Sequence, residues 1–380
     1  MDDLATKPAA ARASDLRIET LEVIRLKLPY RHEVSFKSVS ESSGQYVILR
    51  LLASDGSAGM AEAVARPQQS GDDAVTIAHM LKSYFEPLLI GADPLAHEAI
   101  LGRLDRVKFC RTEKALIDMA LWDLKGVLLG QPVWRLLGGA RPSPIPLTWV
   151  AHGNSTEAMI EEACRMAHER GYKASKLKVW KRSEEDLRMV RAVRQSLGDK
   201  TVIYVDGNGS YSETQARTLL GRLAELDIAF IEEPCKFNDP ARQAALARDL
   251  PIALLGDQSC TTIPDVLQLI KLQAVGAVSV KPKRTGITNS LKIIALCEAA
   301  GIPVVIGTDS ESRIGAQARF HLRAGIPSLA PWPSETHFFD KLADDCFAGE
   351  FLVQGGEALP GDAPGFGAVL DSAKVERYAF

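Results

Sequence analysis

Short runs of β-branched and apolar residues alternate with amphipathic stretches through the second half of the chain. The runs recur every 23 to 30 residues, and most of them end in a charged side chain. Strands that alternate with helices at this spacing predict a parallel sheet, and polar groups at successive strand ends are typical of a (β/α) barrel. The predicted strands cover residues 145–150, 174–180, 201–206, 228–232, 252–257, 276–281 and 303–307, with a last short strand near 328–330.

The first third of the chain has a different pattern. Residues 16–28 and 46–53 predict two antiparallel strands joined by a long loop, residues 59–63 predict a third strand, and helical periodicity follows over 72–139. The expected organisation is a disordered lead-in (1–14), an α+β domain (15–140), a barrel (141–345) and a C-terminal segment that returns to the first domain (346–380).

Length and composition narrow the possible classes. The 380 residues suit a barrel of about 250 residues with a smaller partner domain. A net charge of −3 gives no basic footprint for nucleic acid, and no apolar run is long enough to predict a transmembrane helix. The six cysteines are scattered without a Cys-x-x-Cys pair, which favours free thiols in a cytoplasmic protein.

Three predicted strands end in carboxylates, at Asp206, Glu232 and Asp257. Carboxylates that converge at one end of a barrel repel each other unless a cation lies among them. Oxygen ligands without histidine or cysteine favour Mg²⁺, or Mn²⁺, over zinc. The alternative is that each acid caps the following helix or pairs with an arginine.

Lysines flank these carboxylates. Lys176 and Lys178 are two residues apart on one strand and therefore point to the same side, and Lys281 ends a strand across the barrel. Repulsion between neighbouring ammonium groups favours a neutral Lys178 that can act as a base. Bases on opposite faces of a substrate suit racemisation, whereas one base with a cationic helper suits elimination or cycloisomerisation. A solvated strand end is the alternative for the lysine pair.

Together these residues form a recognisable set of motifs: Lys176-x-Lys178, Asp206-x-Asn208, Glu232-Glu233-Pro234, Gly256-Asp257-Gln258-Ser259, Lys281-Pro282-x-Arg284-x-Gly286 and the run from Ser310 to Gly315. The set resembles the enolase superfamily, and its muconate lactonizing enzyme subgroup in particular, over nearly the whole chain. The resemblance implies a modified TIM barrel, (β/α)7β, with an N-terminal α+β capping domain that the C-terminal tail completes.

The resemblance also implies roles for residues. Asp206, Glu232 and Asp257 would bind Mg²⁺, and Lys178 and Lys281 would be the acid/base pair that removes a proton α to a carboxylate through an enediolate. Substrate contacts would come from Lys176, Asn208 and Glu311. A homo-oligomer is expected. Two positions depart from the usual pattern, Gln258 in place of Glu and Ile287 in place of a second Gly.

The substrate is less constrained. Asp309 follows the seventh predicted strand and Trp332 the eighth, and a carboxylate with an aromatic face in one pocket would favour a cationic nitrogen. The alternative is that Asp309 caps the next helix and Trp332 packs at the rim. Arg31 or Lys37, in the first loop, could meet an acidic substrate group, and a solvated loop is the alternative there. Three readings therefore stay open: a racemase or epimerase of an amino-acid-like carboxylate, a cycloisomerase or dehydratase of an organic acid, and a non-catalytic binding barrel.

Overall fold

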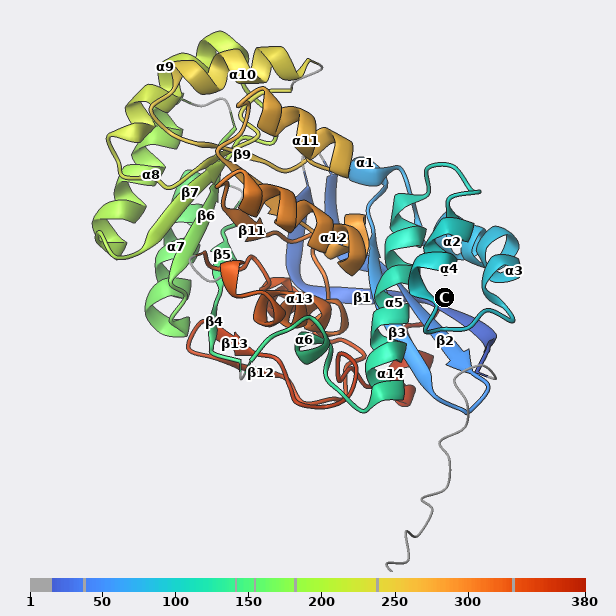
Figure 1. Ribbon diagram of the computed structural model, residues 1–380. Helices are drawn as coiled ribbons and strands as arrows, with labels where there is room; N and C mark the ends of the chain where they lie inside the picture. The colour runs from blue at the N-terminus through green and yellow to red at the C-terminus, as the bar shows by residue number, and fades with distance from the viewer. Residues whose placement is uncertain are drawn as a thin grey trace, which may run out of the picture.

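The computed structural model describes residues 16–380 except 37–38, 141, 154, 181–182, 237–238 and 330–331. A sheet with a helical cover lies beside a curved parallel sheet surrounded by helices (Figure 1). The predicted lead-in at 1–14 lies outside the described residues. This arrangement is the predicted one, a barrel with an α+β capping domain.

The capping domain is built on a three-stranded antiparallel sheet, with order β1 (Ile18–Phe36), β2 (Val39–Ala53) and β3 (Ala58–Ala65). The predicted long loop between the first two strands is wrong, because pairing continues to Phe36 opposite Val39 after a register shift beyond Pro29. The helical part then comprises α1 (Pro67–Ser70), α2 (Ala74–Met80), the π-helical turn η2 (Leu81–Phe85), α3 (Glu86–Leu89), α4 (His97–Leu104), α5 (Arg111–Leu129) and α6 (Val133–Leu136).

Within the described residues, the barrel sheet contains seven parallel strands that pair in chain order. They are β5 (Thr148–Val150), β6 (Ala174–Lys178), β7 (Val202–Asp206), β8 (Ile231–Glu232), β9 (Leu254–Gly256), β10 (Ala277–Val280) and β11 (Val304–Ile306). The helices around them are α7 (Thr156–Arg170), α8 (Ser183–Leu197), α9 (Glu213–Ala224), α10 (Pro240–Asp249), α11 (Ile263–Lys271), α12 (Pro282–Ala299) and α13 (Arg313–Gly325).

The eighth position of the ring is filled later in the chain than predicted. Ser334 forms a parallel bridge to Leu147 before β5, and Glu335 N donates to Ile306 O of β11 at 2.9 Å. The predicted strand near 328–330 is wrong, because Pro327–Leu329 forms the 3₁₀ helix η3. A proline at its first position favours that turn over a sheet ladder.

The C-terminal segment covers both domains. β12 (Leu352–Gln354) and β13 (Glu357–Leu359) form a small sheet with β4 (Ile145–Pro146), after the short 3₁₀ helix η4 (Phe338–Lys341). The last helix, α14 (Ser372–Tyr378), lies on the capping domain, where Ala379 bridges to Leu26 of β1. The tail thus completes the capping domain, as predicted.

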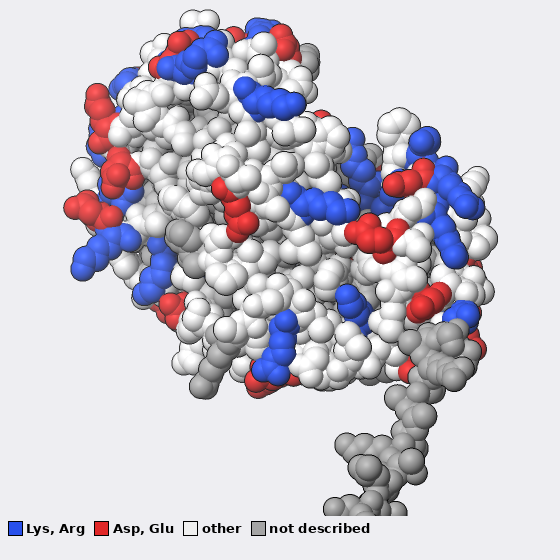
Figure 2. Space-filling view, in the orientation of Figure 1, with Lys and Arg blue, Asp and Glu red and all other residues white. Residues whose placement is uncertain are grey.

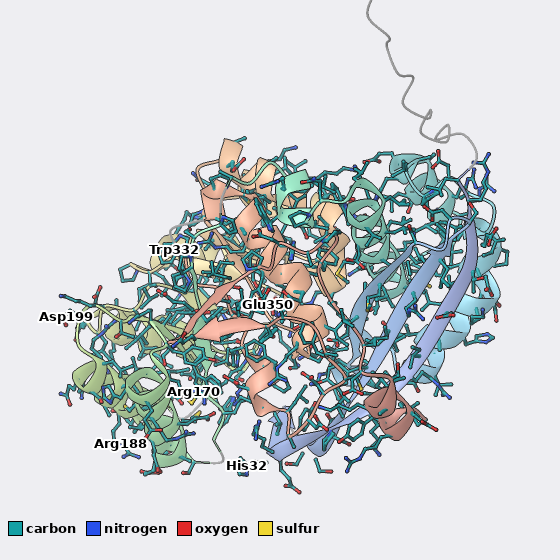
Figure 3. The ribbon with its side chains drawn as sticks, turned by 90° about the horizontal axis from the view of Figure 1, so that it is seen from below. His32, Arg170, Arg188, Asp199, Trp332 and Glu350 are labelled. Carbon is teal, nitrogen blue, oxygen red and sulfur yellow. The ribbon has the colours of Figure 1, made fainter. Side chains whose placement is uncertain are left out.

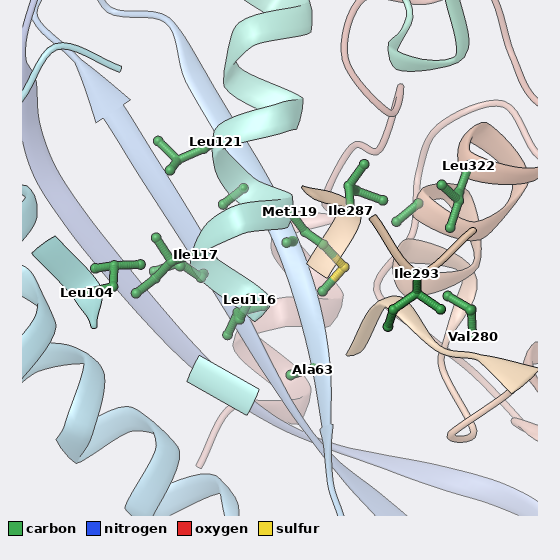
Figure 4. Close-up of a cluster of buried hydrophobic side chains, with 14 of the residues drawn as sticks. Ala63, Leu104, Leu116, Ile117, Met119, Leu121, Val280, Ile287, Ile293 and Leu322 are labelled. Carbon is green, nitrogen blue, oxygen red and sulfur yellow. The ribbon is translucent and has the colours of Figure 1, made fainter. Parts of the chain in front are cut away.

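One hydrophobic core crosses the boundary between the domains. Leu116 and Met119 on α5 face Ile287 and Ile293 on α12 and Val280 on β10 (Figure 4). Each of these side chains is almost fully buried, and full burial of one such residue stabilises by about 1.5–3 kcal/mol. Apolar packing therefore holds the capping domain firmly on the barrel.

The surface offers no single-signed patch on the face in Figure 2, where acidic and basic side chains are interspersed. All six cysteines are free thiols. None of the described helices combines the length and apolar character needed to span a membrane.

A buried carboxylate also joins the domains. Glu62 on β3 accepts hydrogen bonds from the backbone N–H and hydroxyl of Ser312, which caps α13. Burial raises the pKa of Glu62 to about 8, although the Ser312 hydrogen bonds work in the opposite direction. Between pH 4.5 and 8 the folded protein therefore retains a proton that the unfolded chain releases, and stability falls as pH rises.

We expect Glu62→Gln to remove this pH dependence, because the amide cannot ionise. The free energy of unfolding of the variant should improve relative to the wild type by up to about 1.4 kcal/mol per pH unit between pH 5 and 8. Urea unfolding at several pH values measures the difference, with the exposed Glu19→Gln as control. A constant difference across this range would contradict the expectation.

Candidate active site

A small cavity of about 90 Å³ lies at the carboxyl ends of the barrel strands. Eight of the eleven predicted site residues line it: Lys176, Lys178, Asp206, Asn208, Glu232, Asp257, Lys281 and Asp309. Gln68 and Gln69 of α1 reach it from the capping domain, and both are exposed at its mouth. The two domains therefore build the pocket together.

Lys176 lies at the centre of the buried charges. Its Nζ is 2.6 Å from Glu232 Oε2, and 3.2 Å from both Asp206 Oδ2 and Glu335 Oε1. Burial opposes the charge of Lys176, but these three carboxylates outweigh it and hold its pKa well above the usual value. Lys176 is therefore a fixed positive charge.

Lys178 lies two residues after Lys176, at the carboxyl end of the same strand. Its Nζ donates to Asp206 Oδ2 at 2.6 Å and to Asn208 Oδ1 at 2.8 Å. Asn208 adopts a left-handed backbone with φ 44°, and its N–H donates to Asp206 Oδ1 at 2.8 Å. Burial would raise the pKa of Asp206, but Lys178 and Lys176 together lower it. The Asp206-x-Asn208 motif thus holds the Lys178 amine at the pocket.

Glu232 is the least satisfied carboxylate in the pocket. Neither of its oxygens accepts a well-directed hydrogen bond, and the side chain is fully buried. Burial, with repulsion from Asp206 and Glu335, raises its pKa well above the usual value although Lys176 works in the opposite direction. A further positive charge nearby would stabilise the ionised form of the Glu232 carboxylate.

The opposite side of the pocket is organised by Arg284, in the first turn of α12. Arg284 bonds Asp309 through two nitrogens, at 2.9 and 3.1 Å, and Asp257 Oδ1 at 2.8 Å. Lys281 Nζ is 2.8 Å from the same Asp257 oxygen and 3.7 Å from Asp309. Burial and Arg284 oppose the charge of Lys281, but Asp257, Asp309 and Glu232 outweigh them and raise its pKa.

The three predicted metal-binding carboxylates fit a divalent cation in donor chemistry. All are buried, all offer oxygen, and Glu232 lacks directed partners. They are not gathered into a tight ligand group: no cluster of three or more metal-binding side chains occurs among the described residues. Lysine and arginine groups neutralise them in the metal-free protein: Lys176 and Lys178 lie beside Asp206, Lys176 beside Glu232, and Lys281 and Arg284 beside Asp257.

The ammonium-binding pair suggested by Asp309 and Trp332 is not formed. Trp332 packs on Phe230, with ring centroids 4.5 Å apart, in a cluster with Val202, Ala229 and Ala253 at the amino ends of the strands. Figure 3 shows it on the side of Asp199 and apart from His32 in the capping domain. The prediction is wrong because the eighth strand lies after Trp332, not before it.

The other predicted contacts also have protein partners. Arg31 donates to Asp340 O at 3.1 Å and lines a separate cavity of about 840 Å³ beside α7. Glu311 lies beneath the pocket, where it pairs with Arg319 and accepts from Asp309 N. Gln258, which departs from the family pattern, does line the catalytic pocket.

Several residues of the site were not predicted from the sequence, and three of them carry charged or hydrogen-bonding groups next to the lysines and carboxylates or in the pocket wall. Glu335 accepts from Tyr204 at 2.6 Å as well as from Lys176, and Arg66 of the capping domain lines the pocket while almost fully buried. Tyr204 could have been found, because it precedes Asp206 by two residues and so shares its inward face. Glu335 and Arg66 follow no predicted barrel strand.

The fold and the site place the chain among known enzymes. A family described as mandelate racemase / muconate lactonizing enzyme, N-terminal domain, matches residues 18–138, and one described as enolase C-terminal domain-like matches residues 158–374. The chain belongs to the muconate lactonizing enzyme subgroup of the enolase superfamily. It is an isomerase-type enzyme, and members of this subgroup use a divalent metal ion.

Individual relatives divide between two reactions. A chloromuconate cycloisomerase of Cupriavidus necator is 31% identical over 370 residues, covering 96% of this chain and 99% of the relative. An N-succinyl-L-Arg/Lys racemase of Bacillus cereus is 31% identical over 310 residues, covering 81% and 84%. The muconate lactonizing enzyme of Pseudomonas fluorescens complexed with muconolactone superposes with TM-score 0.90, at 28% identity, covering 96% of this chain and 99% of that structure.

Proposed function

We propose that the chain is a divalent-metal-dependent racemase or epimerase, which removes and returns the proton α to the carboxylate of an amino-acid derivative. The observation that carries the proposal is the placement of Lys178 and Lys281. Lys178 ends β6 and Lys281 follows β10, the second and sixth strands of the barrel sheet, and both lysines line one pocket. Amines on opposite sides of a substrate carbon can remove a proton from one face and return it to the other.

The metal site we propose consists of Asp206, Glu232 and Asp257, with Mg²⁺ as the ion and Mn²⁺ as a substitute. A divalent cation bound there would stabilise the negative charge that develops on the substrate carboxylate. Lys176 adds a fixed positive charge on the same side, and Glu335 and Tyr204 hold it in place.

The proton transfers are assigned to the two outer lysines. Lys178 would take the α-proton on its face of the substrate, while Lys281 would supply a proton on the opposite face. In the reverse direction the two exchange roles. Asn208 and Asp206 orient the Lys178 amine, and Asp257 and Asp309 orient the Lys281 amine.

The charges of the pocket favour a substrate whose nitrogen carries no charge. Each carboxylate lining the cavity already has a cationic partner: Lys178 for Asp206, Lys176 for Glu232, and Arg284 for Asp257 and Asp309. A free ammonium group would have to compete with these cations for the acids. The carboxamides of Gln68 and Gln69 would instead meet a polar acyl group at the mouth, beside the buried Arg66. We therefore favour an N-acylated amino acid.

A muconate-type cycloisomerase is the second candidate, because the chloromuconate cycloisomerase relative aligns over nearly its whole length. A dehydratase, whose reaction would begin with the same abstraction of the α-proton, is the third candidate. We also expect a homo-oligomer, as the family resemblance implies.

Proton NMR in D₂O with Mg²⁺ separates the candidates. N-Acyl amino acids, free amino acids and unsaturated diacids are offered in separate pools. We expect the α-proton signal of an N-acyl amino acid to disappear. Loss of vinyl signals from a diacid, with new lactone signals, would replace the proposal by the cycloisomerase, and exchange of free amino acids alone would refute the preference for acylation.

A further inference from the structure

The segment that carries Lys281 is joined to a kink. Lys281 immediately precedes α12, and the helix is interrupted at Gly286, whose φ of 67° and ψ of −175° are not helical. The single turn between them is tied to Lys281, because the N–H groups of Arg284 and Thr285 donate to Lys281 O at 2.8 and 3.3 Å. The position of the kink therefore sets the position of the turn that holds Lys281 and Arg284.

Asp118 of α5 holds this kink from the capping domain. Its Oδ2 accepts from the backbone N–H groups of Ile287 at 2.5 Å and Thr288 at 3.0 Å. Its Oδ1 accepts from the Thr288 hydroxyl at 2.5 Å and lies 2.7 Å from His97 Nε2. Asp118 thereby caps the second segment of α12, whose first N–H groups have no helical partner.

The fit around this carboxylate is close. A Cβ built on Gly286 would lie 2.4 Å from Asp118 Oδ2, so the backbone at the kink rests directly against the acid. Asp118 is buried, and Trp122 Nε1 donates to the Thr288 hydroxyl at 3.0 Å. The apolar contact between Met119 and Ile287 lies alongside (Figure 4). Ile287, one of the two departures from the family pattern, is thus both packed and hydrogen-bonded here.

We propose that Asp118 is a positioning residue for Lys281: a carboxylate of the capping domain fixes the turn that presents the lysine to one face of the substrate. Lys178 stands on β6, across the barrel, and shares none of these contacts. Loss of Asp118 should therefore impair proton transfer on the Lys281 face selectively. This inference rests on the proposed function for its catalytic readout.

The test compares Asp118→Asn with a matched control on the same helix. Asp123 is also buried, and it accepts from the N–H groups of Met60 and Phe366 rather than from α12. Asp123→Asn should therefore lower the melting temperature without distinguishing the two faces. The rate of α-proton exchange in D₂O is measured separately for each enantiomer of the N-acyl substrate. Each rate reports the lysine on the face where that enantiomer carries its α-proton.

For Asp118→Asn we expect exchange on the Lys281 face to fall about 10- to 100-fold, since small misplacements of a reacting group carry costs of this order. Exchange on the Lys178 face should change less than about threefold. Equal losses on both faces, no loss, or the same selectivity in Asp123→Asn would overturn the inference. If Asp118→Asn does not fold, Thr288→Val removes one bond to Asp118 while Thr288→Ser should restore the wild-type behaviour.

A second readout does not depend on the substrate. Reductive methylation of the native protein with formaldehyde and a cyanoborohydride reductant, followed by peptide mass spectrometry, gives the reactivity of each lysine. Asp118→Asn should change the rate at Lys281 at least about threefold and leave Lys178 unchanged. An unchanged Lys281 rate would overturn the inference even if no tested acid is a substrate, whereas a changed rate without substrate exchange would refute only the proposed function.

Discussion

Lys178→Ala should abolish α-proton exchange on one face of the substrate, with a loss of about 10³-fold or more. Positioned acid/base groups contribute about 10²–10⁴-fold, and the Lys178 amine is held at the pocket by both Asn208 and Asp206. The fold should survive, because Asp206 keeps Lys176 as a partner at 3.2 Å. The measurement is enantiomer-resolved exchange in D₂O, with circular dichroism as the check on folding.

Lys281→Ala should give the mirror result, with exchange lost for the other enantiomer and retained on the Lys178 face. The exposed Lys173→Ala, just before β6, is the control for a changed charge alone. Retained exchange of both enantiomers in Lys178→Ala would remove this lysine from the mechanism. Complete loss of both in either variant would point to a single-base reaction and thus toward the cycloisomerase.

Glu232→Gln should separate metal binding from folding. The variant should lose activity and its stabilisation by Mg²⁺, which for a site at 100 times the dissociation constant is about 2.7 kcal/mol. Without metal, its melting temperature should equal or exceed that of the wild type. The reason is that Gln removes a buried carboxylate that lacks directed hydrogen bonds and that Asp206 and Glu335 repel. Lys176 loses its 2.6 Å contact with the Glu232 charge but keeps Asp206 and Glu335 as partners.

The adjacent Glu233 offers the matched control. Its Oε1 accepts hydrogen bonds from Asp257 N, Ser259 N and the Ser259 hydroxyl, at 2.7–2.9 Å. Glu233→Gln should therefore lower the melting temperature of the metal-free protein and retain a response to Mg²⁺. Thermal denaturation with and without Mg²⁺ measures both variants. An undiminished Mg²⁺ shift in Glu232→Gln would contradict the proposed ligand set.

The barrel strands were predictable where apolar runs end in a charged residue, as at Asp206 and Lys281. The eighth strand was misplaced because its residues, Ser334 and Glu335, are polar and very few. An apolar pair at 329–330 looked more like a strand than they did. Periodicity detects a strand through the apolar face it buries, and a short segment that lines a polar pocket has no such face.

The prediction for the first hairpin was wrong for a related reason. Residues 29–38 include a proline and charged side chains, which suggested a loop, yet β1 reaches Phe36 by pairing with β2 beyond a register shift. Local composition marks where pairing is unfavourable in isolation, but tertiary neighbours decide whether it continues. The wrong position of Trp332 came from the eighth strand: because that strand was predicted too early in the chain, Trp332 was assigned to the wrong end of the barrel.

The sequence by itself determined the barrel with its capping domain, the family, and the side chains that meet at one end of the barrel, because strand ends of fixed spacing must converge there. Only the tertiary structure decided how their charges pair. Arg284 forms an ion pair with Asp309, so this carboxylate is not available for a substrate ammonium group. Glu335 and Arg66 reach the site from segments that the sequence did not predict as barrel strands. Asp118 reaches α12 across the domain boundary. Such pairings depend on distances between residues far apart in the chain, which no local pattern encodes.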